Sequence, residues 1–152
     1  MDKPDTIHMI HIAATAQQVW DALTDRELSA GYFFGHRTEF GQVGGDFRVV
    51  RPDGSLDSEG KVLVRDEPRL LRVTWRVVWM EELKDAPPGE VEYRLDDLDG
   101  VVRLTVSEFG RPPQMAKFNE AAREGWSLIL SGLKTLVETG APMPAVKPEP
   151  PK

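Results

Sequence analysis

Apolar and polar side chains alternate along much of the chain with the two-residue period of a β-strand. In residues 70–79 one face is apolar and aromatic, with Leu71, Val73, Trp75, Val77 and Trp79, and these alternate with Arg72, Thr74 and Arg76 on a largely solvated face. The same alternation covers residues 91–96 and 102–107, and Asp-Gly pairs mark hairpin turns. With shorter strands expected at 6–13 and 37–40, the pattern predicts an antiparallel sheet of about seven strands.

Two short helices are expected to follow the first strand. Thr15 and Gln18 have the spacing of a capping box, in which each residue satisfies a backbone N–H at the start of a helix. Thr24 and Glu27 repeat this spacing, which predicts that a second short helix begins there and ends near Ala30.

The last regular element is predicted to be a long helix from about Met115 to Thr139, with Gly140 as its C-terminal cap. Its apolar face carries Gly125 and Gly132. An interior glycine costs a helix roughly 1 kcal/mol relative to alanine, so these glycines indicate either a close approach or an open space against the helix. A curved sheet covered by this helix, with an apolar cavity between them, explains both.

Composition excludes several kinds of partner. Asp and Glu total 25 against 19 Lys and Arg, and no basic run with interleaved aromatic residues is present, so no nucleic-acid partner is expected. The chain has no cysteine, and no apolar run reaches the length of a membrane span. We expect a cytoplasmic protein without membrane insertion, with one domain at 1–140 and a proline-rich, disordered tail at 141–152.

Residues that commonly catalyse reactions or hold metals do not form a known motif. The histidines His8, His11 and His36 lack the spacing to a second ligand that zinc sites show. The G-x-S-x-G sequence of a nucleophile elbow is absent. The glycines at 41–45 lack the lysine of a P-loop and the spacing of a dinucleotide-binding fingerprint. We therefore expect neither a metal nor a cofactor.

Five segments, in this order, resemble motifs of the START-like helix-grip superfamily. They are IAATAQQVWDALTD at 12–25, VGGDFRVVRPDG at 43–54, EGKVLVRDEPRLLRVTW at 59–75, RLTVSE at 103–108 and GWSLILSGLKTLVETG at 125–140. More narrowly, they resemble the branch that is homologous to the activator of the heat-shock chaperone ATPase. The resemblance covers nearly the whole chain except its tail.

The resemblance implies an α+β helix-grip fold with a deep cavity between the long C-terminal helix and the sheet. The superfamily includes lipid carriers, hormone receptors and polyketide cyclases, so the fold alone does not define a function. Bacterial relatives are often encoded beside helix-turn-helix repressors, which suggests a role in stress response or sensing. Relatives tend to carry histidine where this chain has Glu108.

The predicted cavity residues are mainly aromatic, and the alternative is that the same side chains fill an ordinary core. Glu108 continues the inward phase of its strand, unless a bulge near Phe109 turns it to solvent. An arginine such as Arg37, Arg51 or Arg76 would keep an inward Glu108 charged. The expected ligand-binding set is Tyr32, Phe34, Phe47, Trp75, Trp79, Tyr93, Glu108, Phe118, Trp126 and Ile129.

The leading hypothesis is a domain that binds a hydrophobic small molecule, either apolar or aromatic. A cyclase-like or hydrolase-like enzyme is a second hypothesis and would need an acid or base in the cavity, for which Glu108, Tyr93 and His36 are candidates. A chaperone-interacting module is a third hypothesis, suggested only by the name of the resembling family. A homodimer is left open.

Overall fold

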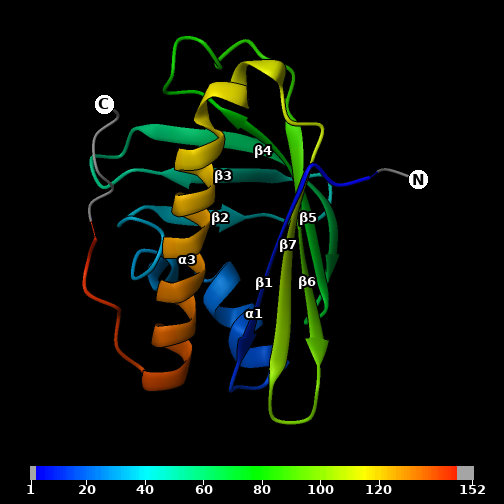
Figure 1. Cartoon of the computed structure of the whole chain (residues 1–152), viewed down its shortest axis with the longest axis vertical. Coiled ribbons are helices and arrows are strands. Elements are labelled where there is room, and N and C mark those ends of the chain that lie inside the picture. The colour runs from blue at the N-terminus through cyan, green and yellow to red at the C-terminus, as the bar shows by residue number, and fades with distance from the viewer. Residues whose placement is uncertain (1–2, 147–152) are drawn as a thin grey trace.

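The computed structural model describes residues 3–146 as a curved antiparallel sheet with a long helix across its concave face (Figure 1). The strands are β1 (Thr6–Ile12), β2 (Arg37–Phe40), β3 (Asp46–Val50), β4 (Leu56–Asp66), β5 (Leu70–Val77), β6 (Gly89–Asp97) and β7 (Val102–Phe109). The helices are α1 (Ala16–Thr24), α2 (Arg26–Ser29), the 3-10 helix η1 (Pro113–Phe118) and α3 (Asn119–Thr139).

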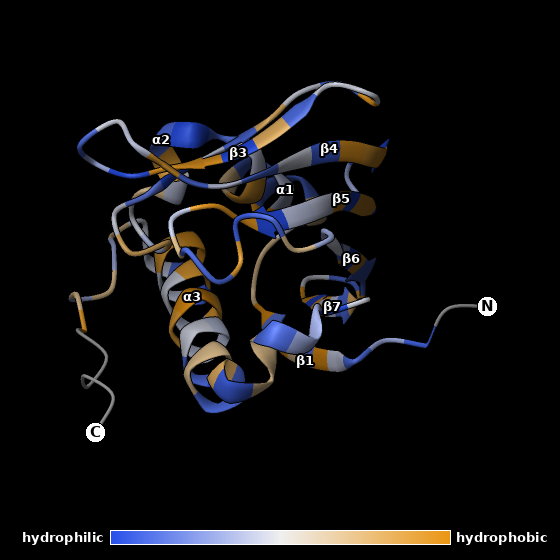
Figure 2. Ribbon diagram, turned by 90° about the horizontal axis from the view of Figure 1, so that it is seen from above, coloured by the Kyte–Doolittle hydropathy of each residue, from blue (hydrophilic) through white to orange (hydrophobic). Residues whose placement is uncertain are grey.

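The seven strands lie in the order β1-β7-β6-β5-β4-β3-β2, and every neighbouring pair is antiparallel. Strands β2 to β7 therefore form a meander, and β1 joins its far edge by pairing with β7. Seen from above, the strands form an arc with α3 on its concave side (Figure 2). The predicted α+β helix-grip architecture is confirmed.

The core lies between the concave face of the sheet and the helices. The period-two pattern is responsible for this, because alternate residues of β5, β6 and β7 point inward and are buried. The face of α3 that meets them contains Trp126, Ile129, Leu130 and Leu133. Val102, Leu104 and Val106 of β7 have no exposed surface. Burial of this apolar area is the main stabilising contribution to the fold.

The start of α1 matches the prediction, but the start of α2 does not. The side chain of Thr15 accepts a hydrogen bond from the backbone N–H of Gln18, and the reciprocal bond of the capping box is also present. The second predicted box is wrong. Asp25 caps α2 by accepting from two backbone N–H groups, while the Thr24 hydroxyl donates to the Trp20 carbonyl in the last turn of α1. A carboxylate is the stronger acceptor for the first N–H groups of a helix, which carry partial positive charge.

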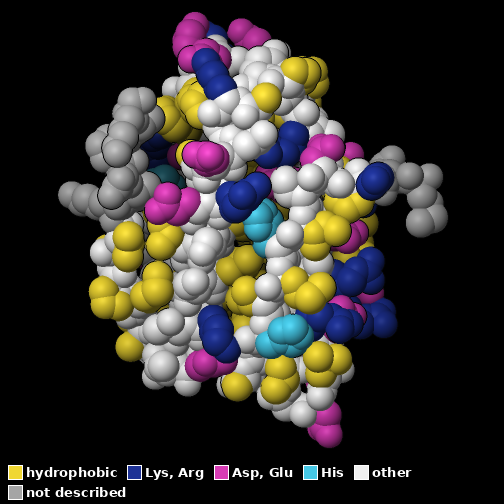
Figure 3. All heavy atoms as spheres, viewed as in Figure 1, with side chains coloured by type: hydrophobic (Ala, Val, Ile, Leu, Met, Phe, Trp, Pro, Cys, Tyr) yellow, Lys and Arg dark blue, Asp and Glu magenta, His cyan; other side chains and the backbone are white. Residues whose placement is uncertain are grey.

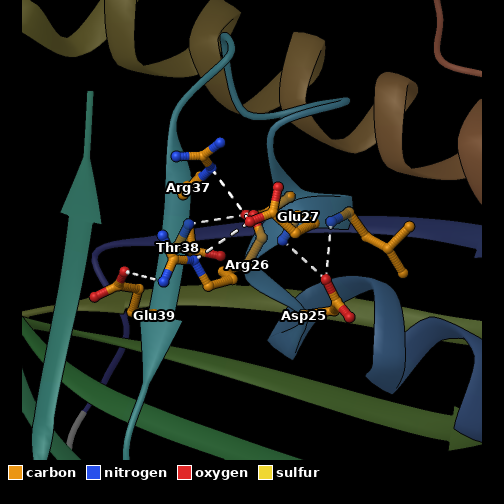
Figure 4. Close-up of polar contacts among 8 residues, drawn as sticks. Asp25, Arg26, Glu27, Arg37, Thr38 and Glu39 are labelled. Atoms are coloured by element: carbon orange, nitrogen blue, oxygen red, sulfur yellow. Dashed lines mark hydrogen bonds and ion pairs between the residues drawn. The ribbon is translucent and has the colours of Figure 1, made fainter. Parts of the chain in front are cut away.

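Polar contacts attach the short helix α2 to the edge strand β2 (Figure 4). Arg26 Nη1 lies 3.6 Å from Glu39 Oε2, and the buried Ser29 hydroxyl accepts a hydrogen bond of 2.8 Å from the Thr38 backbone N–H. These contacts hold both ends of the 30–36 segment, which runs between α2 and β2 along one side of the interior. This segment forms part of the candidate site.

The C-terminal helix begins later than predicted. Residues around Met115 form the 3-10 helix η1, and α3 begins only at Asn119, because Phe118 has a φ of -106° and a ψ of 11° that interrupt the helix. The other end is as predicted: α3 ends at Thr139, and Gly140 adopts the left-handed φ of 79° typical of a C-terminal cap.

Of the predicted tail, residues 141–146 contain neither helix nor strand, and residues 147–152 lie outside the described part of the chain. Among residues 3–146, no helix combines the length and the apolar character needed to cross a membrane.

Candidate functional site

A cavity of about 310 Å³ lies between the sheet and the N-terminal half of α3. Its apolar wall comes from the 30–36 segment, from β5 and from α3, and includes Phe33, Phe34, Trp75, Val77, Trp126 and Ile129. Hydrophobic side chains are visible in the seam between α3 and β1 (Figure 3). The volume lies at the lower end of the range for small-molecule sites, so a compound of one or two rings fits it.

The two glycines of α3 have different structural roles. A Cβ atom added to Gly125 would meet only Phe34 Cζ, at 4.0 Å, and Gly125 lines the cavity. A Cβ atom added to Gly132 would lie 3.0 Å from Tyr32 Cβ and 3.4 Å from Tyr32 Cα. Gly125 therefore leaves open space, whereas Gly132 allows the 30–36 segment to approach the helix closely.

Trp75 is at the centre of the aromatic wall. Its ring centroid lies 4.7 Å from that of Phe47, 6.1 Å from that of Phe33 and 6.1 Å from that of Trp126. Offset and edge-to-face pairs at these distances add to the stability gained by burial alone. The wall of the cavity is thus a set of mutually supported rings, which keeps the space open and its shape defined.

The predicted ligand-binding residues divide between the cavity and the packed core. Five of them line the cavity, namely Phe34, Trp75, Glu108, Trp126 and Ile129. Phe47 is fully buried against Trp75 and does not line the cavity. Tyr32 and Tyr93 border a gap of about 10 Å³, which is too small for a ligand, and the Tyr32 hydroxyl donates to the Ala22 carbonyl at 2.7 Å. Tyr32 also borders a separate hollow of about 610 Å³ beside Gly132 and residues 142–146.

The structure places Trp79 and Phe118, two further residues of the expected ligand-binding set, outside this cavity. Strand β5 ends at Val77, so the alternation stops before Trp79, whose side chain is 53% exposed and lies under the Arg51 guanidinium. Phe118 lies where η1 meets α3, with the Lys117 ammonium 5.3 Å from its ring centroid.

Glu108 faces inward, as the phase of β7 predicts, and its side chain is 13% exposed. Its Oε1 atom accepts a hydrogen bond of 2.7 Å from the Thr6 hydroxyl on the paired strand β1. His8 Nε2 lies 3.9 Å from Oε1, and Arg111 Nε lies 3.9 Å from Oε2. The carboxylate is therefore held at the wall of the cavity by groups from both sides.

The arginine beside Glu108 is Arg111, three residues later in the chain, and not one of the three predicted arginines. Those form other ion pairs: Arg37 with Glu27, Arg51 with Asp57 and Arg76 with Glu59. Arg111 follows the turn at Gly110, where no periodic pattern predicts the direction of a side chain.

His8 is the other neighbour of Glu108 that sequence reasoning missed. Its ring stacks on Trp126 with the ring centroids 5.9 Å apart. Burial lowers the pKa of His8, and this effect exceeds the opposing influence of Glu108. One signal was available, because His8 shares the inward phase of Ile10 and Ile12. Apolar Ile7 and Met9 on the outer face obscured it.

A second polar group borders the cavity near the 30–36 segment. His36 Nδ1 lies 3.8 Å from Asp57 Oδ2, and Arg51 Nε lies 3.4 Å from the same oxygen. Burial lowers the pKa of His36 despite the nearby Asp57 carboxylate. The buried Ser58 hydroxyl donates to Asp57 Oδ1 and not to His36, so these residues do not have the geometry of a serine–histidine pair.

The interior also limits proton-transfer chemistry. The pKa of Tyr93 is raised above its ordinary value because the ring is buried and because the negative charge of Glu108 opposes a phenolate. Tyr93 therefore stays protonated near neutral pH and is not a base there. Within residues 3–146, no group of three or more His, Asp and Glu side chains is arranged to hold a metal ion.

Solved structures share this architecture. DynU16, a protein of the dynemicin biosynthetic locus, superposes with a TM-score of 0.73 at 24% identity, over 90% of this chain and 48% of DynU16. This chain thus spans about half the length of DynU16. EF2215 of Enterococcus faecalis gives a TM-score of 0.72 at 24% identity, over 91% of this chain and 73% of EF2215.

PFC0360w of Plasmodium falciparum, described as an HSP90 activator, gives a TM-score of 0.70 at 17% identity, over 92% of this chain and 99% of its own. These identities are low, so the likeness is one of fold. No curated protein sequence is significantly similar to this chain. The family model for the Activator of Hsp90 ATPase homolog 1-like protein matches residues 13–138, so the chain belongs to that family.

Proposed function

We propose that this protein binds a hydrophobic small molecule, apolar or aromatic, in the cavity between the sheet and α3. The observation that carries the proposal is Gly125. An alanine there would improve the helix by roughly 1 kcal/mol and would meet only one atom, at 4.0 Å, yet the position has no side chain. Protein cores are otherwise closely packed, so a space kept open at this cost supports a binding role.

The aromatic wall is the second support. Trp75 and Trp126 present large apolar surfaces to the cavity, and their rings pack against each other and against further rings outside it. A planar apolar ligand placed among them would gain both buried area and ring stacking. Apolar cavities also release poorly hydrogen-bonded water when a ligand enters, which favours binding.

The proposal can be tested by filling the cavity. Gly125→Leu places a leucine in the open space, and Ser127→Leu places the same side chain on the exposed face of the same helix as a matched control. Binding of anilinonaphthalene sulfonate would be followed by its fluorescence, with circular dichroism to establish that each variant is folded. Native mass spectrometry of the gently purified protein would detect a compound that is already bound.

We expect the parent protein and Ser127→Leu to bind the probe alike, and Gly125→Leu to lose most of its binding while remaining folded. Equal binding by all three proteins would place the probe outside the cavity and contradict the proposal. Failure of the parent protein to bind any apolar probe would also contradict it.

We further propose that the site binds its ligand without converting it, as in stress response or sensing. The polar arrangement supports binding over hydrolysis, because the Ser58 hydroxyl donates to Asp57 and has no bond to His36. Incubating the protein with a compound recovered by native mass spectrometry, followed by chromatography, tests this. Appearance of a product at a rate that depends on protein concentration would favour the enzyme alternative.

A further inference from the structure

Glu108 and Arg111 stand at the boundary between the cavity and the surface. Both residues line the 310 Å³ cavity, and both also line a neighbouring surface cleft of about 620 Å³. The cleft brings together residues from β1 and from the start of α3, including His8, Asn119 and Arg123. A ligand lying among the aromatic rings therefore has one end beside the Glu108–Arg111 pair.

This pair has unused hydrogen-bonding capacity. Arg111 Nη1 donates to Asn119 Oδ1 at 2.8 Å, but the buried Nε and Nη2 atoms donate to no protein group that the structure describes. These two atoms form one planar edge of the guanidinium, a fork suited to an oxygen acceptor. The carboxylate is also incompletely used, because the hydrogen bond recorded within residues 3–146 goes to Oε1 and not to Oε2.

The distance between the Glu108 carboxylate and the Arg111 guanidinium indicates which ligand group fits between them. Arg111 Nε and Glu108 Oε2 are 3.9 Å apart, which is too long for a direct hydrogen bond. One oxygen atom at about 2.8 Å from each group would give both of them a hydrogen bond. It would have to accept from the guanidinium and donate to the carboxylate. A hydroxyl group has this combination, since its oxygen accepts and its hydrogen is donated.

Other polar groups fit less well. A ligand carboxylate would meet the negative charge of Glu108, and an amine cation would meet the positive charge of Arg111. A ketone or ether would accept from Arg111 but would leave the Glu108 oxygen without a donor. Five aromatic rings, those of Phe33, Phe34, Trp75, Phe109 and Trp126, line the rest of the cavity, so the hydroxyl belongs on an aromatic compound that can stack on them.

We propose that the ligand is a hydroxylated aromatic compound whose hydroxyl group bridges Glu108 Oε2 and the Nε–Nη2 edge of Arg111. This inference rests on the proposed binding function and adds its chemical selectivity. Thr6 holds the other carboxylate oxygen, and Asn119 holds the other guanidinium nitrogen, so both anchors are pre-positioned.

The test compares 2-naphthol with its methyl ether, 2-methoxynaphthalene, which keeps the rings and the oxygen but cannot donate a hydrogen bond. Dissociation constants would be measured by isothermal titration calorimetry for the parent protein, Glu108→Gln and Arg111→Met. Matched controls are Asp96→Asn and Arg103→Met, which alter an ion pair of 3.3 Å between β6 and β7 that does not line the cavity. Gly125→Leu checks that both probes enter the cavity.

We expect the parent protein and both controls to bind 2-naphthol at least about tenfold more tightly than the ether, the size of effect that a hydrogen bond to a charged group produces. Glu108→Gln and Arg111→Met should each reduce this preference several-fold while binding of the ether changes little. Gly125→Leu should lose both probes.

Equal affinity of the parent protein for the two probes would overturn this inference, and so would a preference that neither Glu108→Gln nor Arg111→Met reduces. In both cases binding of the ether that Gly125→Leu abolishes would leave the proposed function standing. If neither probe binds the parent protein, or if Gly125→Leu binds both normally, the proposed function fails as well.

Discussion

Helix α3 borders two regions of the interior that differ in packing. At Gly132 the 30–36 segment is in contact with the helix and the neighbouring Leu133 has no exposed surface, and we call this the closed region. A separate hollow of about 610 Å³, lined in part by residues 142–146, also borders Gly132 and Tyr32. Around Gly125 the interior is open and forms the cavity. The same residue type, on the same face of the same helix, thus serves close packing at one position and open space at the other.

Hydrogen bonding differs between the two regions in the same way. In the closed region the buried Tyr32 hydroxyl donates to the Ala22 carbonyl, and the Thr38 backbone N–H donates to Ser29. At the cavity, buried nitrogen atoms of His8 and Arg111 have Glu108 as a charged neighbour but no hydrogen-bond partner among the described protein groups. Two further buried nitrogen atoms without a hydrogen bond, in Trp20 and Arg76, lie away from the cavity. Buried polar groups are normally hydrogen-bonded, so the three atoms of His8 and Arg111 beside the cavity mark donors available to a ligand.

The largest effect is expected for Gly132→Leu. Even a Cβ atom here would lie 3.0 Å from Tyr32 Cβ, so a leucine must displace the 30–36 segment or the helix. We expect the free energy of unfolding to fall by about 3 kcal/mol, at the upper end of the usual cost of overpacking, despite the better helix propensity of leucine. Urea denaturation measures this. A variant as stable as the parent protein would mean that the closed region has room that we do not assign to it.

A smaller loss is expected for Tyr32→Phe, which keeps the ring and removes the hydroxyl from the same closed region. The Ala22 carbonyl then loses a buried donor at 2.7 Å, and we expect a destabilisation of about 1.5 kcal/mol. Urea denaturation would be repeated under the same conditions, together with the binding assay. Binding of apolar probes should be unchanged, and a loss of binding would mean that the two regions are coupled.

Gly125→Leu should behave in the opposite way to Gly132→Leu. The new side chain enters open space, and leucine is the better helix former, so we expect stability to stay the same or to rise by up to about 1 kcal/mol. Ser127→Leu is the control, because Ser127 lies on the exposed face, where a leucine improves helix propensity without burying apolar area. The difference in unfolding free energy between the two variants therefore measures the effect of buried area. Destabilisation by Gly125→Leu comparable to that by Gly132→Leu would remove the distinction between the two regions.

The cavity region should also make stability depend on pH. Burial lowers the pKa of His8 below its ordinary value of 6.5, so the folded state favours the neutral ring. The contribution of His8 to the free energy of unfolding is therefore fully present above about pH 6.5. It is lost as the pH falls through the pKa that His8 has in the folded state.

His8→Phe keeps a ring beside Trp126 and removes the titration. Thermal unfolding between about pH 7 and pH 5 should show a smaller decline for this variant than for the parent protein. Burial also lowers the pKa of His36, so His36 should cause part of the decline in stability in both proteins. Identical pH dependence of the two proteins would contradict the assignment of His8 to the buried site.

The smallest effect is expected for removal of residues 143–152. Residues 143–146 are exposed or half-buried and have no helix or strand, so we expect the free energy of unfolding to change by less than about 0.5 kcal/mol. Differential scanning calorimetry of the shortened and full-length proteins measures the difference. A fall in melting temperature of many degrees would show that this segment contributes to packing around Gly132.

Much of the fold could be predicted from local patterns, and the errors occur at the ends of elements. Alternation identified β5 correctly but was extended to Trp79, because sequence alone does not show where a strand leaves the sheet. The spacing of Thr24 and Glu27 suggested a cap, but the adjacent Asp25 competes better for the same N–H groups. Both errors concern a choice between local alternatives that tertiary contacts decide.

The sequence by itself determined that an amphipathic helix with two glycines covers the apolar face of an antiparallel sheet, because periodicity is a local property of the chain. For Glu108 the alternation left two alternatives, an inward side chain or a bulge near Phe109 that turns it to solvent, and the structure has it inward. Only the tertiary structure decided that Gly125 borders open space while Gly132 contacts Tyr32, and that His8 and Arg111 flank Glu108. The reason is physical: the distance between helix and sheet, and the pairing of β1 with β7, arise from contacts between residues far apart in sequence.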